Sequence, residues 1–451
     1  MLRRRLVLLA VGVLLGAGLI AGALGAAGAA LVDRPGQAAA LGSNGTTRAD
    51  PSPELTHPST DEARADSPAS PSEVDATAGT PSAAPTPTAT PSPISEPEQF
   101  VLPELAQRLS DALIAEGALV DGVLGVAVID DQGRTVLNFS ADSVAMPAST
   151  QKLVTAAAAL KVLGPGFRYR TEVRGTAPIE EGLIDGDLIL IGSGDPTLGS
   201  PTFGTVEPDR PRTAMEALAD RVVAAGVQRI TGRVLGDPTV FADEPAAPGW
   251  LDRYFDQFDA TKVSGLTIDG GRRLFHRDDQ LLAEVAEDPA VEAAASLHVL
   301  LKERGVEIEG GGPGSLRRPR PAPERVASIS SPRLDELLQR MVQHSDNHLA
   351  DAIFRTIGAE AGDPTWEGSA TAAMDSLEPL GLDWTGARLA DGSGLSRDDR
   401  LSPRQLAHLQ QRMLAAGDAS LWDGLLAVSG ESGTLRKRYR GTVADHRLRG
   451  K

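Results

Sequence analysis

The chain contains no cysteine in its 451 residues, and aromatic residues make up only 4% of it. The first absence excludes disulfides, thiolate metal sites and a cysteine nucleophile. The second argues against large aromatic platforms for stacking bases. The formal net charge is −17, so the chain also lacks the basic surface that nucleic-acid binding requires. We therefore expect no nucleic-acid partner.

Lysine and asparagine are rare as well. Only 6 of the 44 basic residues are lysine, and the chain has 3 asparagines beside 30 serines. A buried lysine amine can lose its proton near neutral pH, whereas an arginine guanidinium stays protonated. A lysine retained in so arginine-rich a chain therefore indicates a position that needs a titratable amine.

Two short motifs use these rare residues. Residues 149–152 read S-T-Q-K, an S-x-x-K motif, and residues 345–347 read S-D-N, an S-x-N motif. Random placement of the observed counts predicts roughly 0.4 copies of the first motif and roughly 0.2 of the second, so this ordered pair is informative. The chain has no H-E-x-x-H and no G-x-S-x-G sequence, which argues against a zinc protease and an α/β-hydrolase.

The S-x-x-K motif opens a helix that the Ala-rich pattern predicts over residues 150–163. Positions i and i+3 share one face of a helix, so the Lys152 amine is expected close to the Ser149 hydroxyl. The helix N-terminus favours the negative charge that nucleophilic attack develops. Lys152 must be neutral part of the time, which requires desolvation or a second cation such as Lys451. The alternative interpretation is a helix-capping serine beside an unrelated lysine.

The S-x-N motif lies between two predicted helices, 334–343 and 347–359. A turn there would aim short polar side chains into a cleft, where Ser345 could relay a proton and Asn347 could orient Lys152. A helix-capping turn would use the same residue types.

Two histidines flank this motif. His344 and His348 stand at i and i+4, a spacing that zinc sites use on a single helix. The segment straddles a turn, however, and carries no zinc-protease motif. We expect neither a metal nor another cofactor.

The N-terminal part differs in composition from the rest. Three arginines at residues 3–5 precede an uncharged run over 6–32, whose 27 residues would extend about 40 Å as a helix, beyond the roughly 30 Å of a bilayer core. We predict a signal peptide or membrane anchor over 1–34, with the rest of the chain outside the cytoplasm. Residues 35–98 are rich in Pro, Ser and Thr, which predicts a disordered linker.

Globular patterning begins near residue 99. Residues 99–166 are expected to form one part of a catalytic domain, residues 167–325 a mostly β insertion, and residues 326–451 the second part. Other predicted elements are a helix over 102–116, a hairpin of strands 125–129 and 135–139, strand-like runs over 182–191 and 229–236, and one helix within the insertion, over 291–304.

Four further segments accompany the two motifs: residues 192–198 (G-S-G-D-P-T-L), 266–272 (L-T-I-D-G-G-R), 391–396 (D-G-S-G-L-S) and 433–435 (G-T-L), and the S-x-N motif itself reads H-S-D-N with residue 344. With them the chain, from about residue 100 to 451, resembles the D-alanyl-D-alanine carboxypeptidase/endopeptidase family of low-molecular-mass class C penicillin-binding proteins. The resemblance implies an α+β fold, a serine β-lactamase/DD-peptidase-like domain with helices around an antiparallel sheet.

The resemblance also implies roles for individual residues. Ser149 would be the acylated nucleophile, Lys152 its general base and Ser345 the proton relay. Asn347 and Lys451 would bind substrate, with Lys451 opening the family's K-T-G strand. The implied substrates are peptidoglycan stem peptides ending in D-Ala-D-Ala, which an extracytoplasmic enzyme would meet. Penicillins and other β-lactams would acylate the same serine.

In one respect the chain departs from the family pattern. The Thr and Gly of K-T-G and the strands beyond them do not follow Lys451, so we expect a fragment of a longer gene product that is inactive as written. Two rival functions stay open: a β-lactamase or esterase on the same fold, and a penicillin-sensing or wall-binding module without turnover. No asparagine here follows a glutamate by four residues, as class A β-lactamases would require.

Overall fold

The computed structural model describes residues 6–7, 12–15, 104, 107–108, 111 and 122–451. Within these residues, no helix is both long enough and apolar enough to cross a membrane. The predicted linker over 35–98 lies outside them, as does most of the predicted segment over 1–34. The helix predicted over 102–116 is described at four residues only, and all four are helical.

The described N-terminal residues form strands. β1 (Leu6–Val7) and β2 (Gly12–Leu15) pair antiparallel with β3 (Gly122–Asp130). These six residues are thus extended, whereas the length of residues 6–32 was considered above for a helix. The physical reason is that the edge of β3 offers unpaired N–H and C=O groups, and an extended segment satisfies them.

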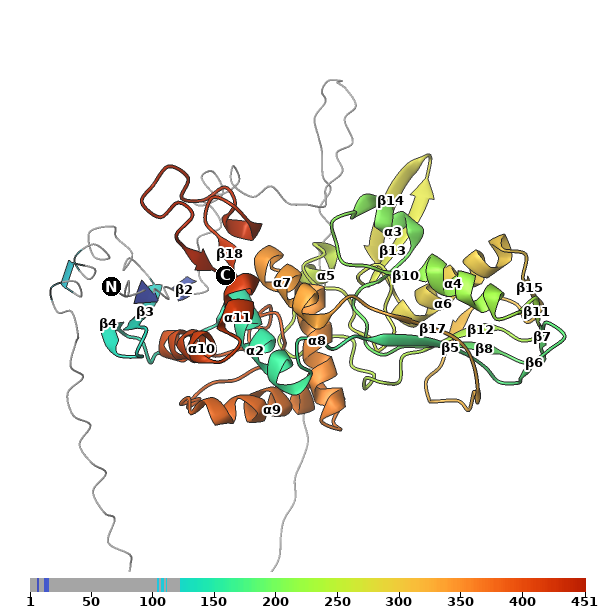
Figure 1. Ribbon diagram of the computed structural model, residues 1–451, viewed down its shortest axis with the longest axis horizontal. Helices are drawn as coiled ribbons and strands as arrows, with labels where there is room; N and C mark the ends of the chain where they lie inside the picture. Colours follow the sequence, from blue (N-terminus) through green and yellow to red (C-terminus); the bar gives the residue numbers. More distant parts are fainter. Residues whose placement is uncertain (1–5, 8–11, 16–103, 105–106, 109–110, 112–121) are drawn as a thin grey trace, which may run out of the picture. The chain divides into compact units, whose positions relative to one another are not determined.

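The helices around the S-x-x-K motif share one hydrophobic core (Figure 1). They are α2 (Lys152–Val162), α7 (Leu334–His344), α8 (Asn347–Glu360), α9 (Trp366–Leu377), α10 (Pro403–Ala415) and α11 (Ala419–Leu425). The centre of α2 is a run of alanines, 156–159, with no exposed surface. Such small side chains let α8 and α9 approach the α2 backbone closely.

Helix α10 packs against β3, which forms a hairpin with β4 (Thr135–Phe139). The first turn of α10 lies directly against β3: a Cβ atom on Gly125 would come within 2.8 Å of Pro403 Cγ. This close approach explains a glycine in the middle of a strand. The hairpin predicted from the sequence is present with nearly the same bounds.

The inserted region, as predicted over 167–325, contains most of a five-stranded mixed sheet in the order β16-β12-β8-β5-β17, whose last strand runs on to Ser330. Its strands are β5 (Arg170–Gly175), β8 (Leu188–Ile191), β12 (Val234–Asp237), β16 (Gly314–Ser315) and β17 (Glu324–Ser330). β8, β12 and β16 run parallel, whereas β5 is antiparallel to both β8 and β17. The sheet shares a second hydrophobic core with α4 (Met215–Ala224) and α6 (Pro289–Glu303).

The insertion holds more helix than the sequence predicted. Besides α6 it contains α3 (Pro201–Val206), α4 and α5 (Arg253–Asp256). α4 buries Met215, Leu218, Ala219 and Val222, a helical i, i+3, i+4, i+7 stripe that the strand-like segments around it obscured.

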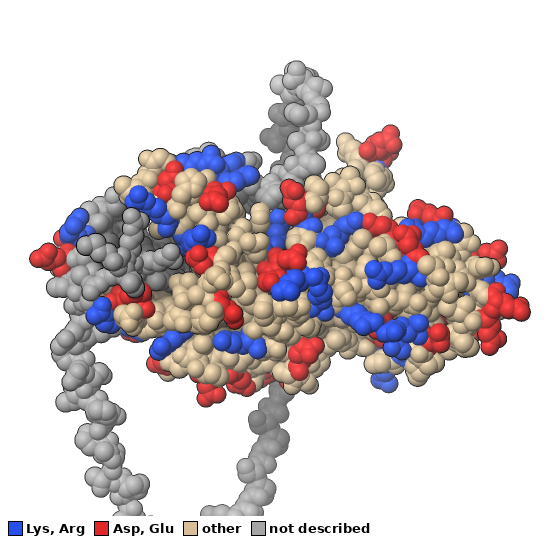
Figure 2. All heavy atoms as spheres, in the orientation of Figure 1, with Lys and Arg blue, Asp and Glu red and all other residues tan. Residues whose placement is uncertain are grey.

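The other elements are short. They are η1 (Ala148–Gln151), β6 (Ile179–Glu180), β7 (Leu183–Ile184), β9 (Leu198–Gly199), β10 (Thr213–Ala214), β11 (Arg229–Ile230), β13 (Arg272–Arg277), β14 (Gln280–Val285), β15 (Glu307–Ile308), η2 (Glu378–Leu380), β18 (Ala427–Val428), η3 (Gly433–Leu435) and β19 (Arg449–Gly450). On the face drawn in Figure 2, acidic and basic side chains intermingle.

Candidate active site

Ser149 lies in a tight turn rather than in the first turn of an α-helix. The turn is η1, a 3₁₀ helix that leads directly into α2. It begins at Ala148, whose φ of 46° is in the left-handed region. The loop after residue 390 presses on this turn, since a Cβ atom on Gly394 would come within 1.8 Å of the Ala148 carbonyl oxygen. A rigid loop therefore holds the Ser149 backbone.

The Lys152 side chain is fully buried and its amine makes three contacts. Nζ lies 3.2 Å from Ser149 Oγ, 2.7 Å from Asn347 Oδ1 and 2.7 Å from the Ser393 carbonyl oxygen. The two shorter contacts are to oxygens that only accept hydrogen bonds. A neutral lysine amine has two N–H donors, so these two acceptors occupy them and leave the lone pair for the Ser149 hydroxyl.

The S-x-N turn faces the same serine. Ser345 caps the C-terminus of α7 in a left-handed conformation with φ 60°, and its Oγ donates to Ser149 Oγ at 2.8 Å. Asn347 opens α8 and donates from Nδ2 to the Asp259 carbonyl oxygen at 2.7 Å. Because that donor contact fixes the amide, Oδ1 points to Lys152. The structure thus brings together Ser149, Lys152, Ser345 and Asn347.

The Lys152 amine has a strongly perturbed pKa. Burial lowers the pKa of Lys152 from its usual value near 10.5 to about 8, against the opposing effect of the carboxylates of Asp351, Asp391, Asp346 and Asp399. Burial removes water that would stabilise the ammonium. A substantial fraction of the amine is therefore neutral at mildly alkaline pH.

Lys451 lies close enough to this amine to be affected by it. The residue follows β19, which pairs antiparallel with β18. Burial lowers the pKa of Lys451 to about 6, with a further contribution from the charge of Lys152. The positive charge of Lys152 therefore favours the neutral form of Lys451.

Residues that sequence reasoning assigned no role also support the lysine. Asp391 accepts the backbone N–H groups of Ser393, Gly394 and Ser396 at 2.6 to 2.9 Å. This folds the loop whose Ser393 carbonyl meets Lys152. The D-G-S-G-L-S segment had been recognised as a family signature, and its Asp followed by small residues is the available signal of a carboxylate-centred loop.

Two further carboxyl groups lie beneath α2. Asp351 accepts the Gly392 N–H at 3.0 Å, and Asp399 accepts from Gln151 Nε2 at 2.8 Å. Burial raises the pKa of Asp351 well above its usual range and that of Asp399 to about 8, and the charge of Asp391 adds to both shifts. Neither position carried a sequence signal, because both depend on long-range packing.

The two histidines do not share a site. His344 ends α7, whereas His348 lies in the first turn of α8 with Nδ1 3.0 Å from Thr261 Oγ1. Burial, with the charge of Arg210, lowers the pKa of His348 to about 3, so its ring is neutral. In the described part of the chain, no group of three or more His, Cys, Asp or Glu side chains is arranged to hold a metal ion.

Comparisons with known proteins bear on this arrangement. The family model described as D-Ala-D-Ala carboxypeptidase 3 (S13) matches residues 105–284 and 276–451. The D-alanyl-D-alanine carboxypeptidase of Actinomadura sp. (strain R39) is 29% identical over 421 residues, which cover 76% of this chain and 75% of that protein. Carboxypeptidase DacB of Mycolicibacterium smegmatis is 32% identical over 343 residues, which cover 74% of this chain and 71% of that protein.

A solved structure shares the fold. The crystal structure of penicillin binding protein 4 (dacB) from Haemophilus influenzae aligns with a TM-score of 0.61 at 22% identity, covering 70% of this chain and 80% of that one. The same protein complexed with a β-lactam aligns with a TM-score of 0.54 at 21% identity. The predicted α+β class of the DD-peptidase fold is confirmed.

Proposed function

The chain belongs to the D-Ala-D-Ala carboxypeptidase 3 (S13) family, and from this premise we propose that it is a serine-type D-Ala-D-Ala carboxypeptidase with Ser149 as its nucleophile. The observation that carries the proposal is the contact network of Ser149 Oγ, with Lys152 Nζ at 3.2 Å and Ser345 Oγ at 2.8 Å. A hydroxyl between a buried amine and a second hydroxyl is equipped for nucleophilic catalysis.

Acylation begins with neutral Lys152. Its lone pair takes the Ser149 proton while Oγ attacks the carbonyl carbon of the penultimate D-Ala. The resulting ammonium stays in contact with the Asn347 and Ser393 oxygens, which stabilise its charge. Proton transfer of this kind typically contributes 10²- to 10⁴-fold to the rate.

The leaving amine then needs a proton. Ser345 passes one from its hydroxyl to the terminal D-Ala amine and recovers one from the Lys152 ammonium, which took it from Ser149 during the attack. The C–N bond breaks, D-Ala leaves, and the acyl group stays on Ser149. Water attacks this ester in the second half of the reaction, with Lys152 again accepting the proton.

Substrate binding is assigned to the remaining pair. Asn347 would bind substrate beside Ser149, and Lys451 would pair with the terminal carboxylate of the stem peptide, whose negative charge favours the protonated form of the Lys451 amine. β-Lactams carry a carboxylate and an activated amide in a similar arrangement, so they would acylate Ser149 and stay attached.

The site of action follows from the substrate. An enzyme of this family acts on peptidoglycan, which lies outside the cytoplasmic membrane. The finer proposal is that residues 1–34 hold the chain at the membrane and residues 35–98 carry the catalytic region away from it. The basic cluster at residues 3–5 and the uncharged run after it support this proposal.

The test is release of D-alanine from a diacetylated tripeptide L-Lys-D-Ala-D-Ala by the protein expressed from its natural gene. We expect one equivalent of D-alanine per peptide, and none with Ser149→Ala. The control variant Ser143→Ala removes a hydroxyl elsewhere on the surface and should retain the activity. Release by Ser149→Ala at the unaltered rate would overturn the proposal.

A further inference from the structure

One feature of the S-x-N turn is not used by the proposed chemistry. Its middle residue, Asp346, pairs with the inserted region, where Arg210 Nη2 lies 3.1 Å from Oδ1 and 3.0 Å from Oδ2. Only 7% of the arginine side chain and 6% of the aspartate side chain are exposed. The pair joins the catalytic turn to a segment 136 residues earlier in the chain.

Asp346 has a second task on its own helix. Its Oδ1 accepts the Leu349 N–H at 3.1 Å and so caps α8 at its N-terminus. Because Ser345 and Asn347 flank Asp346 directly, the position of this carboxylate sets where the hydroxyl and the amide on either side of it point. A cation that holds the carboxylate therefore holds both groups.

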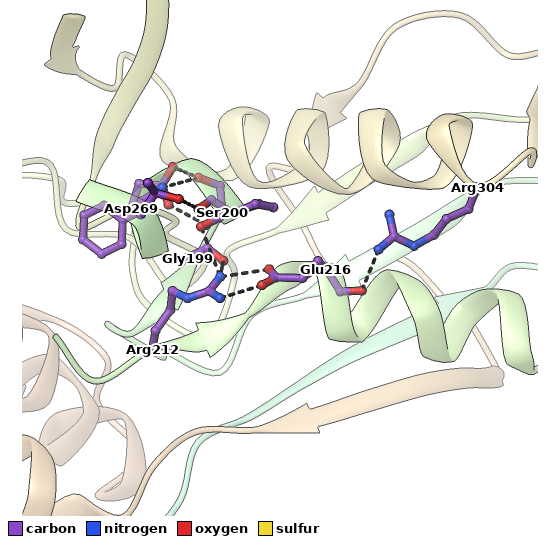
Figure 3. Close-up of polar contacts among 9 residues, drawn as sticks. Gly199, Ser200, Arg212, Glu216, Asp269 and Arg304 are labelled. Carbon is purple, nitrogen blue, oxygen red and sulfur yellow. Dashed lines mark hydrogen bonds and ion pairs between the residues drawn. The ribbon is translucent and has the colours of Figure 1, made fainter. Parts of the chain in front are cut away.

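The segment that carries Arg210 is pinned at its first end. Ser200 donates to the Asp269 carboxylate from its backbone N–H at 2.7 Å and from its hydroxyl at 2.8 Å. Figure 3 shows this pair beside the Gly199 carbonyl. Ser200 also caps α3 by accepting from Phe203 N.

The far end of the segment is pinned as well. Arg212 donates to the carbonyl oxygens of Gly199 and Ser200 at 3.0 and 3.1 Å. It also pairs with both oxygens of Glu216, at 2.8 and 2.5 Å (Figure 3). Residues 200 and 212 are thereby held together, and the chain between them forms a loop closed at its base.

Within this loop the Arg210 side chain lies near both Phe203 and Gly270. Its guanidinium carbon lies 5.6 Å from the Phe203 ring centroid. On the other side, a Cβ atom on Gly270 would come within 3.7 Å of Nη2, and Gly270 has a φ of +66°. The L-T-I-D-G-G-R signature thus supplies both the Asp269 anchor and the glycine beside the guanidinium.

We propose that Arg210 is a positioning residue for catalysis: the inserted region holds the S-x-N turn against Ser149 through the buried Arg210–Asp346 pair. This inference rests on the proposed function. Displacement of reacting groups by about 1 Å can cost about 100-fold in rate. Loss of the pair therefore slows acylation of Ser149 rather than merely loosening the fold.

A second cation lies near the same carboxylate. Arg340, on α7, has Nε 3.9 Å from Asp346 Oδ2, which is the outer limit of an ion pair. Its hold on the turn is weaker because charge attraction and hydrogen bonding both fall with distance. It provides a graded comparison for Arg210.

The experiment measures the rate of acylation by a fluorescent penicillin, with thermal melting followed by circular dichroism on the same samples. Arg210→Gln is expected to acylate about 100-fold more slowly than the unaltered protein at a temperature well below its melting point. Arg340→Gln should lose less than about fivefold. Arg229→Gln, which breaks a half-exposed pair with Glu309 elsewhere in the inserted region, should leave the rate unchanged.

Two further variants separate positioning from stability. Asp346→Asn and the double variant Arg210→Gln/Asp346→Asn complete a cycle in which the two losses should not add, because both cut one link. Arg210→Lys keeps a cation and should recover at least tenfold over Arg210→Gln. If Arg210→Gln does not fold, Asp346→Asn carries the test.

The outcomes distinguish the two proposals. Acylation of Arg210→Gln, or of Asp346→Asn in its place, within threefold of the unaltered protein would overturn the positioning role, as would fully additive losses in the cycle. Failure of the unaltered protein to react with penicillin would instead overturn the proposed function.

Discussion

At the scale of single residues, the proposed mechanism depends most on the contacts of the Lys152 amine. Its two shortest contacts are to oxygens that cannot donate a proton, and its third is to Ser149 Oγ. Of the three contacts, only the Ser149 hydroxyl has a proton that the Lys152 amine can accept. Burial of Lys152 in addition favours the neutral state of its amine.

Lys152→Gln tests the role of the amine. The amide keeps hydrogen-bonding capacity but cannot act as a base, so acylation of Ser149 by penicillin should slow by about 10²- to 10⁴-fold. The matched control is Lys161→Gln, which removes an exposed lysine from the same helix and should acylate at the unaltered rate. Stopped-flow fluorescence gives both rates. Equal rates for the two variants would exclude Lys152 as the base.

The pH dependence of acylation follows from the same amine. The reactive form is the neutral one, and the pKa of Lys152 is lowered to about 8. Below that value the ammonium dominates, so the rate should rise about tenfold per pH unit from pH 6 and level off above about pH 8. An unperturbed lysine would keep the rate rising to beyond pH 10. A rate that falls between pH 6 and pH 8 contradicts this assignment.

At the scale of elements, the site depends on how closely the loop after residue 390 approaches η1. Gly394 has a φ of +81° and no room for a side chain, since a Cβ atom would meet the Ala148 carbonyl oxygen at 1.8 Å. The turn that carries Ser149 and the loop that carries the Ser393 carbonyl are therefore fitted to one another. A shift in either changes the distances at Lys152.

Gly394→Ala should be more damaging than a glycine substitution in open space. Gly226 also has a positive φ, +95°, but nothing lies within 4 Å of a Cβ atom there. Gly226→Ala should cost about 1–2 kcal/mol from backbone strain alone. Gly394→Ala should lose about 1–3 kcal/mol more through overpacking, and should slow acylation as well. Urea denaturation measures both, and equal losses would show that the close approach does not constrain the turn.

The sequence predicted helices α2, α7 and α8 and the β3–β4 hairpin because their patterns are local. The S-x-N turn was expected between two helices, and accordingly α7 ends at His344 and α8 begins at Asn347. The 3₁₀ start of α2 was not predicted, since Ala148 adopts its left-handed backbone only because the Gly394 loop packs on it. Helix α4 was missed because its four-residue apolar stripe lies among strand-like segments.

The acidic groups around Lys152 were beyond sequence reasoning for a different reason. Asp351 lies 199 residues from Lys152 and Asp399 lies 247 residues from it along the chain. Only the packing of α8 and of the loop after residue 390 against α2 brings these carboxyl groups to the amine. Motif order identified Ser149, Lys152 and Ser345 as candidates, but the distances between them come from tertiary contacts.

At the scale of the whole molecule, the inserted region makes hydrogen bonds with the residues around Ser149 at several points besides Arg210. Arg355, on α8 and fully buried, donates to the carbonyl oxygens of Ala242 and Glu244 at 2.9 and 3.0 Å. Trp250 donates to Asp391 Oδ2 at 2.8 Å. The inserted region therefore forms part of the support of the site.

The N-terminal segment makes a prediction at the same scale. If residues 1–34 form an uncleaved anchor, the native protein should stay in the membrane pellet after an alkaline carbonate wash, and its intact mass should include residues 6–32. A soluble protein whose mature N-terminus lies among the small residues at 25–30 would show instead that the segment is a cleaved signal peptide.

The central claim is that Ser149 becomes acylated, and mass spectrometry of the penicillin-treated native protein tests it most directly. The account predicts a mass increase of one penicillin per chain that persists for many minutes, maps to the peptide containing Ser149 and is absent from Ser149→Ala. An adduct on any other residue, or penicillin hydrolysed rapidly without a lasting adduct, would contradict it.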